Sequence, residues 1–167
     1  MIYIDIPLCE KWVFEFIHVV LTNDEPAPDY RTEQDGIAEL AKVLNFVRND
    51  VYYPEFADKA AYMLCSIAGA QYFSNGNKRL AVVLLISFLI INQAEIITLK
   101  ESQFKEILGV LFPAYVWEEK PNIQDPHAQF LYNLAVIIGS PDKWDVQKFD
   151  DLKKKISSLF MSIYKVS

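Results

Sequence analysis

The stretch that decides the fold of this chain is Gln71-Tyr72-Phe73-Ser74-Asn75-Gly76-Asn77-Lys78-Arg79, followed by an apolar run from Leu80 to Ile91. Ser87 is the only polar residue of that run. A segment that is apolar all round predicts a buried helix, and this one is shorter than the roughly 20 residues that span a bilayer. We therefore predict a central core helix over about residues 78–92, beginning directly after a Gly-Asn pair.

The start of this helix is electrostatically unusual. Asn77 is a suitable N-cap because its side-chain oxygen can accept a hydrogen bond from a free backbone N–H. Lys78 and Arg79 in the first turn oppose the helix dipole, at a cost of about 0.3–1 kcal/mol each when exposed. A bound anion would reverse that cost, since the free N–H groups and both cations would converge on it. The alternative is a plain loop in which Gly76 ends one helix, Asn77 caps the next and both cations are solvated.

Length and composition predict one soluble domain, residues 1–167. The chain is 52% hydrophobic with a formal net charge of -6, and a chain of this size buries about 70% of its unfolded surface. Cys9 and Cys65 lie within helix-like apolar patterns, which predicts reduced thiols and a cytoplasmic location. Residues 1–8 lack the basic and apolar regions of a signal peptide. The acidic total argues against DNA binding or a membrane-surface function.

Hydrophobic periodicity predicts a mainly helical chain. Helices are expected at residues 8–21, 37–47, 54–67, 78–92, 102–112, 126–139 and 141–164. Residues 22–32 contain turn-forming residues and predict a loop, whereas Ile96, Ile97 and Leu99 predict a brief extended segment. The last helix carries an amphipathic seam that packs on its own domain or, alternatively, contacts a second copy or a partner. That seam consists of Phe149, Leu152, Ile156, Leu159 and Ile163.

A small β-hairpin is predicted just before the helix at 54–67. Asn49-Asp50 is typical of a turn, and Val51, Tyr52 and Tyr53 favour extended structure. The fold class predicted from these features is therefore all-α, with a helical bundle around the central helix, a hairpin flap and an extra C-terminal helix.

The stretch from Gln71 to Arg79 resembles the Fic signature in its Doc (death-on-curing) form. That signature reads His-x-Phe-x-Asp/Asn-Gly-Asn-Lys-Arg and lies between one helix and a buried helix. The matching residues are Phe73, Gly76, Asn77, Lys78 and Arg79. The resemblance extends over roughly residues 8–139, with the helix at about 141–165 as an accessory. It implies a single Fic/Doc-like domain.

This resemblance implies a protein that transfers part of a nucleotide to a protein hydroxyl. Fic relatives mostly transfer AMP, and the Doc branch resembles kinases. The backbone N–H groups of Gly76, Asn77 and Lys78 would hold nucleotide phosphates, and Arg79 would pair with phosphate oxygens. Phe73 would anchor the loop. Val51, Tyr52 and Tyr53 would form the flap that pairs with an extended target strand. ATP or another nucleotide, with Mg²⁺, would be the cofactor.

Two positions depart from the signature. The family's histidine takes the proton from the attacking hydroxyl, but Gln71 stands in its place. An amide can orient a hydroxyl but cannot accept its proton near neutral pH, and loss of a general base commonly costs about 10²–10⁴ in rate. Asn75 occupies the position of the Mg²⁺-binding acid, and its neutral oxygen is a weaker ligand for a hard cation. The chain's two histidines, His18 and His127, are expected to be solvated or locally hydrogen-bonded.

Three functional hypotheses follow. The first is a transferase with weak activity, and the second is a pseudoenzyme that binds a nucleotide or a protein. The third is a structural domain that has lost the nucleotide as well. The resemblance allows a protein target such as a translation factor, an antitoxin-like partner and a homodimer.

Overall fold

A computed structural model of the chain describes residues 1–20, 26 and 28–167. Its helices are α1 (Ile6–Leu8), a π-helical stretch (Cys9–Val13), α2 (Phe14–Val20), α3 (Gln34–Phe46), α4 (Phe56–Ala68), α5 (Asn77–Ile91), α6 (Glu101–Leu111), α7 (Pro126–Ile138) and α8 (Phe149–Ile163). Short 3-10 turns lie at Tyr30–Thr32 and Pro141–Lys143, and the strands are β1 (Glu95–Ile96) and β2 (Tyr164–Lys165). The predicted all-α class is confirmed. Residues 21–25 and 27, in the predicted loop and at the end of the first predicted helix, lie outside the described residues.

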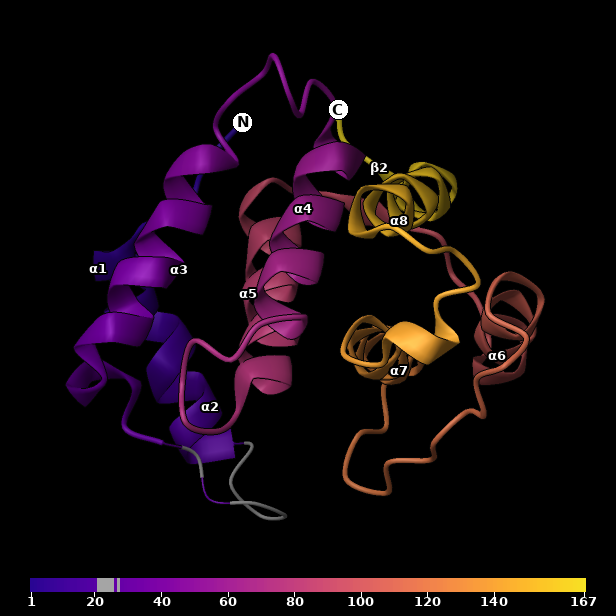
Figure 1. The fold of residues 1–167 in the computed structure, drawn as a ribbon, viewed down its shortest axis with the longest axis horizontal. Coiled ribbons are helices and arrows are strands. Elements are labelled where there is room, and N and C mark those ends of the chain that lie inside the picture. The colour runs from indigo at the N-terminus through magenta and orange to yellow at the C-terminus, as the bar shows by residue number, and fades with distance from the viewer. Residues whose placement is uncertain (21–25, 27) are drawn as a thin grey trace.

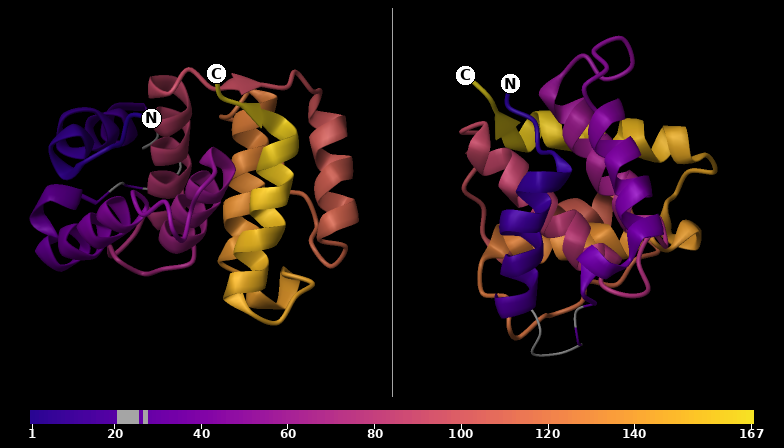
Figure 2. Two further views of the ribbon diagram at one scale, coloured as in Figure 1. Left: turned by 90° about the horizontal axis from the view of Figure 1, so that it is seen from above. Right: turned by 90° about the vertical axis from the view of Figure 1, so that its left-hand side faces the viewer.

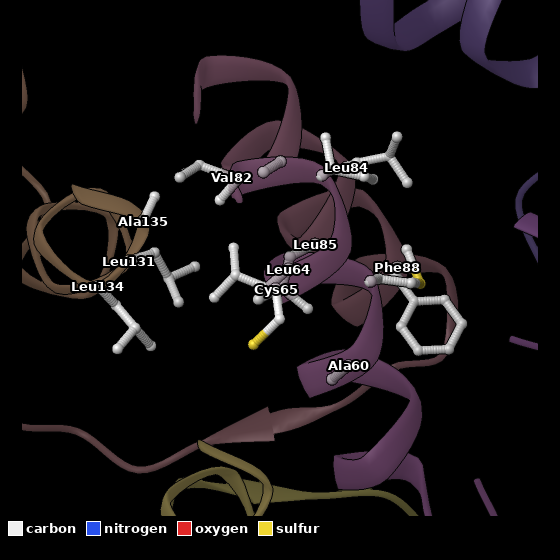
Figure 3. Packing of buried hydrophobic residues seen from close by; sticks show 14 of the residues in the cluster. Ala60, Leu64, Cys65, Val82, Leu84, Leu85, Phe88, Leu131, Leu134 and Ala135 are labelled. Carbon is white, nitrogen blue, oxygen red and sulfur yellow. The ribbon is translucent and has the colours of Figure 1, made fainter. Parts of the chain in front are cut away.

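The core is built around the antiparallel pair α4 and α5. Helices α7 and α8 pack on one side of this pair, while α1, α2 and α3 lie on the other (Figure 1). Figure 3 shows side chains of α7 pointing toward those of α4 and α5, namely Leu131, Leu134 and Ala135 toward Leu64, Cys65 and Val82. Burial on several sides explains why the α5 sequence is apolar around its whole circumference.

The predicted central helix is confirmed, but its cap differs from the prediction. Gly76, not Asn77, is the N-cap, and it has a left-handed backbone with φ 72°. Asn77 is the first helical residue, and its side chain is buried. The chain turns too sharply before α5 for a residue with a Cβ atom to be favourable at the corner. The helix ends at Ile91, within one residue of the predicted end.

The predicted hairpin at Val51–Tyr53 is wrong. Residues 47–52 form turns, and the described residues contain strands only at β1 and β2, which pair antiparallel. The turn is held instead by the Lys59 ammonium, which donates to Asp50 Oδ1 at 2.7 Å and to the Val47 carbonyl at 3.0 Å. Val51 is 87% exposed, so its side chain packs against little of the chain. β propensity stabilises a strand only through such packing against neighbouring strands.

The last predicted helix is shorter than its sequence pattern suggests. A 3-10 turn covers Pro141–Lys143, Asp145 has a left-handed φ of 56°, and α8 begins at Phe149. The seam itself is confirmed. Four of its side chains are buried against the rest of the chain, namely Leu152, Ile156, Leu159 and Ile163, whereas Phe149 is 36% exposed. The Ser157 hydroxyl also donates to Asp58 Oδ1 of α4 at 2.5 Å. The seam therefore packs within the chain, as the first alternative predicted.

Candidate functional site

The α4–α5 loop is anchored by the ring of Phe73, which is 2% exposed. Tyr30 meets this ring edge-on at a centroid distance of 5.0 Å, and Phe14 meets it at 6.4 Å. Gly36 of α3 lies so close that a Cβ atom there would come within 2.6 Å of the ring. Phe73 is therefore held by three elements that precede the loop in sequence.

Asn77 fixes the loop from within. Its Oδ1 accepts a hydrogen bond from the Phe73 N–H at 3.0 Å, and its Nδ2 donates to the Phe73 carbonyl at 2.9 Å. Both bonds are buried, so each is costly to lose. The amide thus bridges the two ends of the five-residue segment from Phe73 to Asn77.

Gly76 forms the corner of the loop. The Tyr30 hydroxyl donates to its carbonyl at 2.9 Å, and a Cβ atom at this position would overlap that hydroxyl. Burial raises the pKa of the Tyr30 hydroxyl to about 12. The positive charge of Arg79 lowers this pKa and the negative charge of Glu33 raises it, both by less than burial does. The hydroxyl therefore stays protonated and remains a donor at neutral pH.

Glu33 is a site residue that the sequence reasoning missed. It precedes α3 as the N-cap, yet its carboxylate does not cap its own helix. Instead its two oxygens accept hydrogen bonds from the Ser74 N–H at 2.7 Å and from the Ser74 hydroxyl at 2.9 Å. Only the tertiary fold brings these positions together, because 41 residues separate them. An acidic N-cap is too common to have identified this contact from sequence.

The two cations of the first turn point in different directions. Arg79 Nη2 donates to the Pro26 carbonyl at 3.3 Å and lies 3.4 Å from where a Gly76 Cβ would be, so its guanidinium is at the loop corner. The Lys78 side chain instead lies against Gly139, whose hypothetical Cβ would be 3.6 Å from the ammonium. Gly139 ends α7, and a cation is favourable at a helix C-terminus. Lys78 thereby offsets its unfavourable position at the start of α5.

Backbone donors are present at the same corner. The first intrahelical bond at this end runs from the Leu80 N–H to the Gly76 carbonyl at 3.0 Å. The N–H groups of Asn77 and Lys78 precede it, and like other N–H groups at a helix start they have no intrahelical partner; among the described residues they are bonded to no other acceptor. The Gly76 N–H is already bonded to Asn75 Oδ1 at 2.7 Å.

Gln71 is exposed at the beginning of the loop. His127 does not replace the family's histidine beside Gln71. Its Nε2 lies 2.7 Å from the Tyr164 hydroxyl, and burial lowers the pKa of its imidazole to about 4. His18 is exposed in the last turn of α2, with no contact to the loop among the described residues. The structure thus brings no histidine against Gln71 within the described part of the chain.

Val51, Tyr52 and Tyr53 are not brought to the loop. They precede α4, whereas the loop follows it, and a 13-residue helix is about 20 Å long. Figure 1 shows the two connections at opposite ends of α4. The predicted flap residues therefore do not form one site with residues 71–79.

The donor set does not fit a protein-bound Mg²⁺. Asn75 Oδ1 is turned toward the Gly76 N–H, and the Glu33 carboxylate is occupied by Ser74. The described residues contain no cluster of three or more His, Cys, Asp or Glu side chains suited to a metal. A hard cation needs several oxygen ligands, and residues 71–79 do not offer such a set.

Fold and loop together define a class: a helical protein whose buried central helix begins at a glycine corner with two basic residues in its first turn. The N-terminal half, residues 7–89, matches the sequence model of the Fic/DOC family, and through it the chain belongs to this family. The match ends within α5, short of the residue 139 to which the resemblance was extended. No curated protein and no solved structure matched the chain. Among the described residues, no helix is long and apolar enough to cross a membrane.

Proposed function

We propose that residues 75–79 bind the phosphates of a nucleotide, with ATP as the first candidate. The observation that carries this proposal is the convergence of the Arg79 guanidinium and the first free N–H groups of α5 on one glycine corner. Helix starts with free N–H groups favour anions, and arginine pairs with phosphate oxygens through two parallel bonds. The buried bonds of Asn77 and the locked Phe73 ring hold this corner before any ligand arrives.

Transfer to a protein hydroxyl is the activity that family membership favours, and Gln71 makes it weak or absent. The amide can orient an attacking hydroxyl but cannot accept its proton. The second candidate, a pseudoenzyme that binds a nucleotide or a protein partner, is favoured by the same residue. Mg²⁺, if required, would be held mainly by the phosphates, because the loop lacks a free carboxylate. A protein target, an antitoxin-like partner and a cytoplasmic location remain proposals that follow from the family.

Isothermal titration calorimetry with millimolar ATP tests the binding proposal, with and without Mg²⁺. We expect binding to wild type and a loss of at least tenfold in affinity for Arg79→Ala, while Gln71→Ala changes it little. Arg48→Ala is the matched control, since this arginine lies at the far end of α4, over the Tyr3 ring at 5.3 Å. No heat for wild type, or equal losses for all three variants, would contradict the proposal.

A second experiment separates the transferase from the pseudoenzyme. Labelled ATP is incubated with cell lysate and either wild type or Gln71→His. A transferase whose base alone is missing should gain labelling by about 10²–10⁴ in the histidine variant, the usual value of a general base. If Gln71→His binds ATP with wild-type affinity yet labels no protein, the pseudoenzyme is the correct function.

A further inference from the structure

An aromatic face lies where α3, the turn after it and α4 meet the start of α8. The rings of this aromatic face are Phe46, Tyr52, Tyr53, Tyr62 and Phe149. Tyr53 and Tyr62 are stacked at a centroid distance of 4.3 Å, and Phe46 meets them at 5.8 and 5.7 Å. Tyr52 extends the row from Phe46 at 5.5 Å. Figure 2 (right) shows the turn between α3 and α4 projecting at one end of the molecule.

Much of the aromatic face is open to solvent. Tyr52 is 65% exposed, Phe46 43% and Phe149 36%. The Lys153 ammonium of α8 joins Phe149 to the row, because it lies 5.3 Å from the centroid of that ring and 5.7 Å from that of Tyr62. Aromatic residues are enriched in protein interfaces, where they supply a large contact area at a low cost in conformational entropy. The face therefore has the composition of a binding surface.

The tyrosine hydroxyls of the face are hydrogen-bond donors. Burial raises the pKa of Tyr53, and it raises the pKa of Tyr62 to about 12, so both hydroxyls stay protonated. Their oxygens accept hydrogen bonds from Lys153 and Ser66, which lower the pKa of each phenol by less than burial raises it. Each O–H group thus remains to donate to a ligand.

The side-chain acceptors beside the face are already bonded. Asp150 pairs with Lys153 at 3.0 Å, and Asp50 pairs with Lys59 at 2.7 Å. Asn49 Oδ1 accepts a hydrogen bond from the main chain of the same turn at 3.0 Å. A single-stranded nucleic acid also stacks on aromatic rings, but it requires a basic groove along its backbone. The paired charges, and the formal net charge of -6, do not supply one.

A proline-rich segment in the polyproline II conformation matches this set of groups. Proline lacks the backbone N–H, and polyproline II leaves its carbonyls free to accept. Such a segment brings acceptors and apolar rings to a face of donors and aromatic rings. An added strand would bring N–H groups that need acceptors, and a helix has its carbonyls already bonded.

We propose that the aromatic face binds a proline-rich segment of a partner protein in the polyproline II conformation. The aromatic rings hold the pyrrolidine rings, and the tyrosine hydroxyls donate to the carbonyls between them. The inference is independent of the nucleotide proposal, because residues 71–79 take no part in the face.

An NMR titration with decaproline tests the proposal, and a Gly-Ser peptide of the same length is the ligand control. Wild type should bind decaproline but not the flexible peptide, with amide shifts at residues 46–53 and 149–153. Tyr52→Ala should weaken binding at least tenfold, because it removes the most exposed ring of the face. Trp12→Ala is the matched control, since this ring is 63% exposed outside the face, and it should leave the affinity unchanged.

Tyr53→Phe separates hydrogen bonding from ring contact. The variant keeps the ring and loses the donor, so its affinity for decaproline should fall about threefold to tenfold. No binding of decaproline by wild type at millimolar concentration, an unchanged affinity in Tyr52→Ala or Tyr53→Phe, or an equal loss in Trp12→Ala would each overturn the proposal. Tighter binding of an oligothymidine, released by salt, would also overturn it and would assign the face to nucleic acid.

Discussion

Replacement of Gly76 by alanine should be the most informative single perturbation of the loop. Gly76 has a left-handed backbone with a φ of 72°. Other residues already occupy the space that a side chain at this position would need. A Cβ atom there would overlap the Tyr30 hydroxyl and approach Pro28 Cδ at 3.3 Å. The substitution therefore combines backbone strain with a steric conflict at a hydroxyl that is bonded to the same residue.

The expected cost is about 1.5–3.5 kcal/mol. A residue with a Cβ atom in the left-handed region costs about 1–2 kcal/mol, and displacement of the Tyr30 hydroxyl from the Gly76 carbonyl costs about 0.5–1.5 kcal/mol more. In a Tyr30→Phe background the hydroxyl and its conflict are both absent. There, Gly76→Ala should cost only the backbone part, about 1–2 kcal/mol.

Urea unfolding at neutral pH measures these free energies, and Gly109→Ala is the matched control. Gly109 lies inside α6, and nothing is within 4 Å of its hypothetical Cβ, so alanine should stabilise the chain by about 0.5–1 kcal/mol. We expect Gly76→Ala to lower the free energy of unfolding and Gly109→Ala to raise it. The cost of Gly76→Ala should be smaller in the Tyr30→Phe background. If Gly76→Ala costs less than 1 kcal/mol, or costs the same in both backgrounds, the reasoning about this corner is refuted.

Three further changes test other parts of the fold. Burial lowers the pKa of His127 to about 4, below its ordinary value near 6.5. The unfolded chain therefore binds the proton more readily than the folded chain. The free energy of unfolding is unaffected by this group above pH 6.5 and falls as the pH drops toward 4. The loss should reach about 2 kcal/mol by pH 5, with a flatter curve for His127→Gln in urea unfolding across this range. Asp50→Ala should cost about 1.5–3 kcal/mol because it leaves the Lys59 ammonium, at 1% exposure, buried without its carboxylate partner. Glu39→Ala, which removes an exposed pair with Lys42, is the control and should cost less than 1 kcal/mol. Similar costs for the two variants in thermal unfolding would argue against this account. Asn77→Ala should cost about 1–3 kcal/mol because Phe73 loses two buried bonds, and unchanged hydrogen exchange at the Phe73 amide would contradict that role.

Local sequence patterns were sufficient for the helices that pack by periodicity. The apolar run gave α5 to within about a residue at each end, because a segment without a polar face has no stable place except the interior. The seam of α8 was likewise readable, although its start was placed too early. The left-handed Asp145 and the 3-10 turn that precede α8 have no periodic signature.

The candidate site was only partly readable. The motif identified the loop, its glycine and its basic pair, whereas the partners that shape the loop come from far along the chain. Tyr30 and Glu33 reach it across 46 and 41 residues. The flap was misplaced because β propensity describes a strand that has a partner, and the turn at residues 47–52 has none.

By itself, the sequence determined that a buried helix begins at a Gly-Asn corner with two cations, and that no histidine precedes it at the position of the family's base. Only the tertiary structure decided what those cations do: Lys78 lies at the end of α7, and Arg79 stays at the corner. It also decided that Asn77 is a buried clamp and not a cap. The physical reason is that side-chain direction at a helix start depends on the elements packed around it, which local periodicity does not encode.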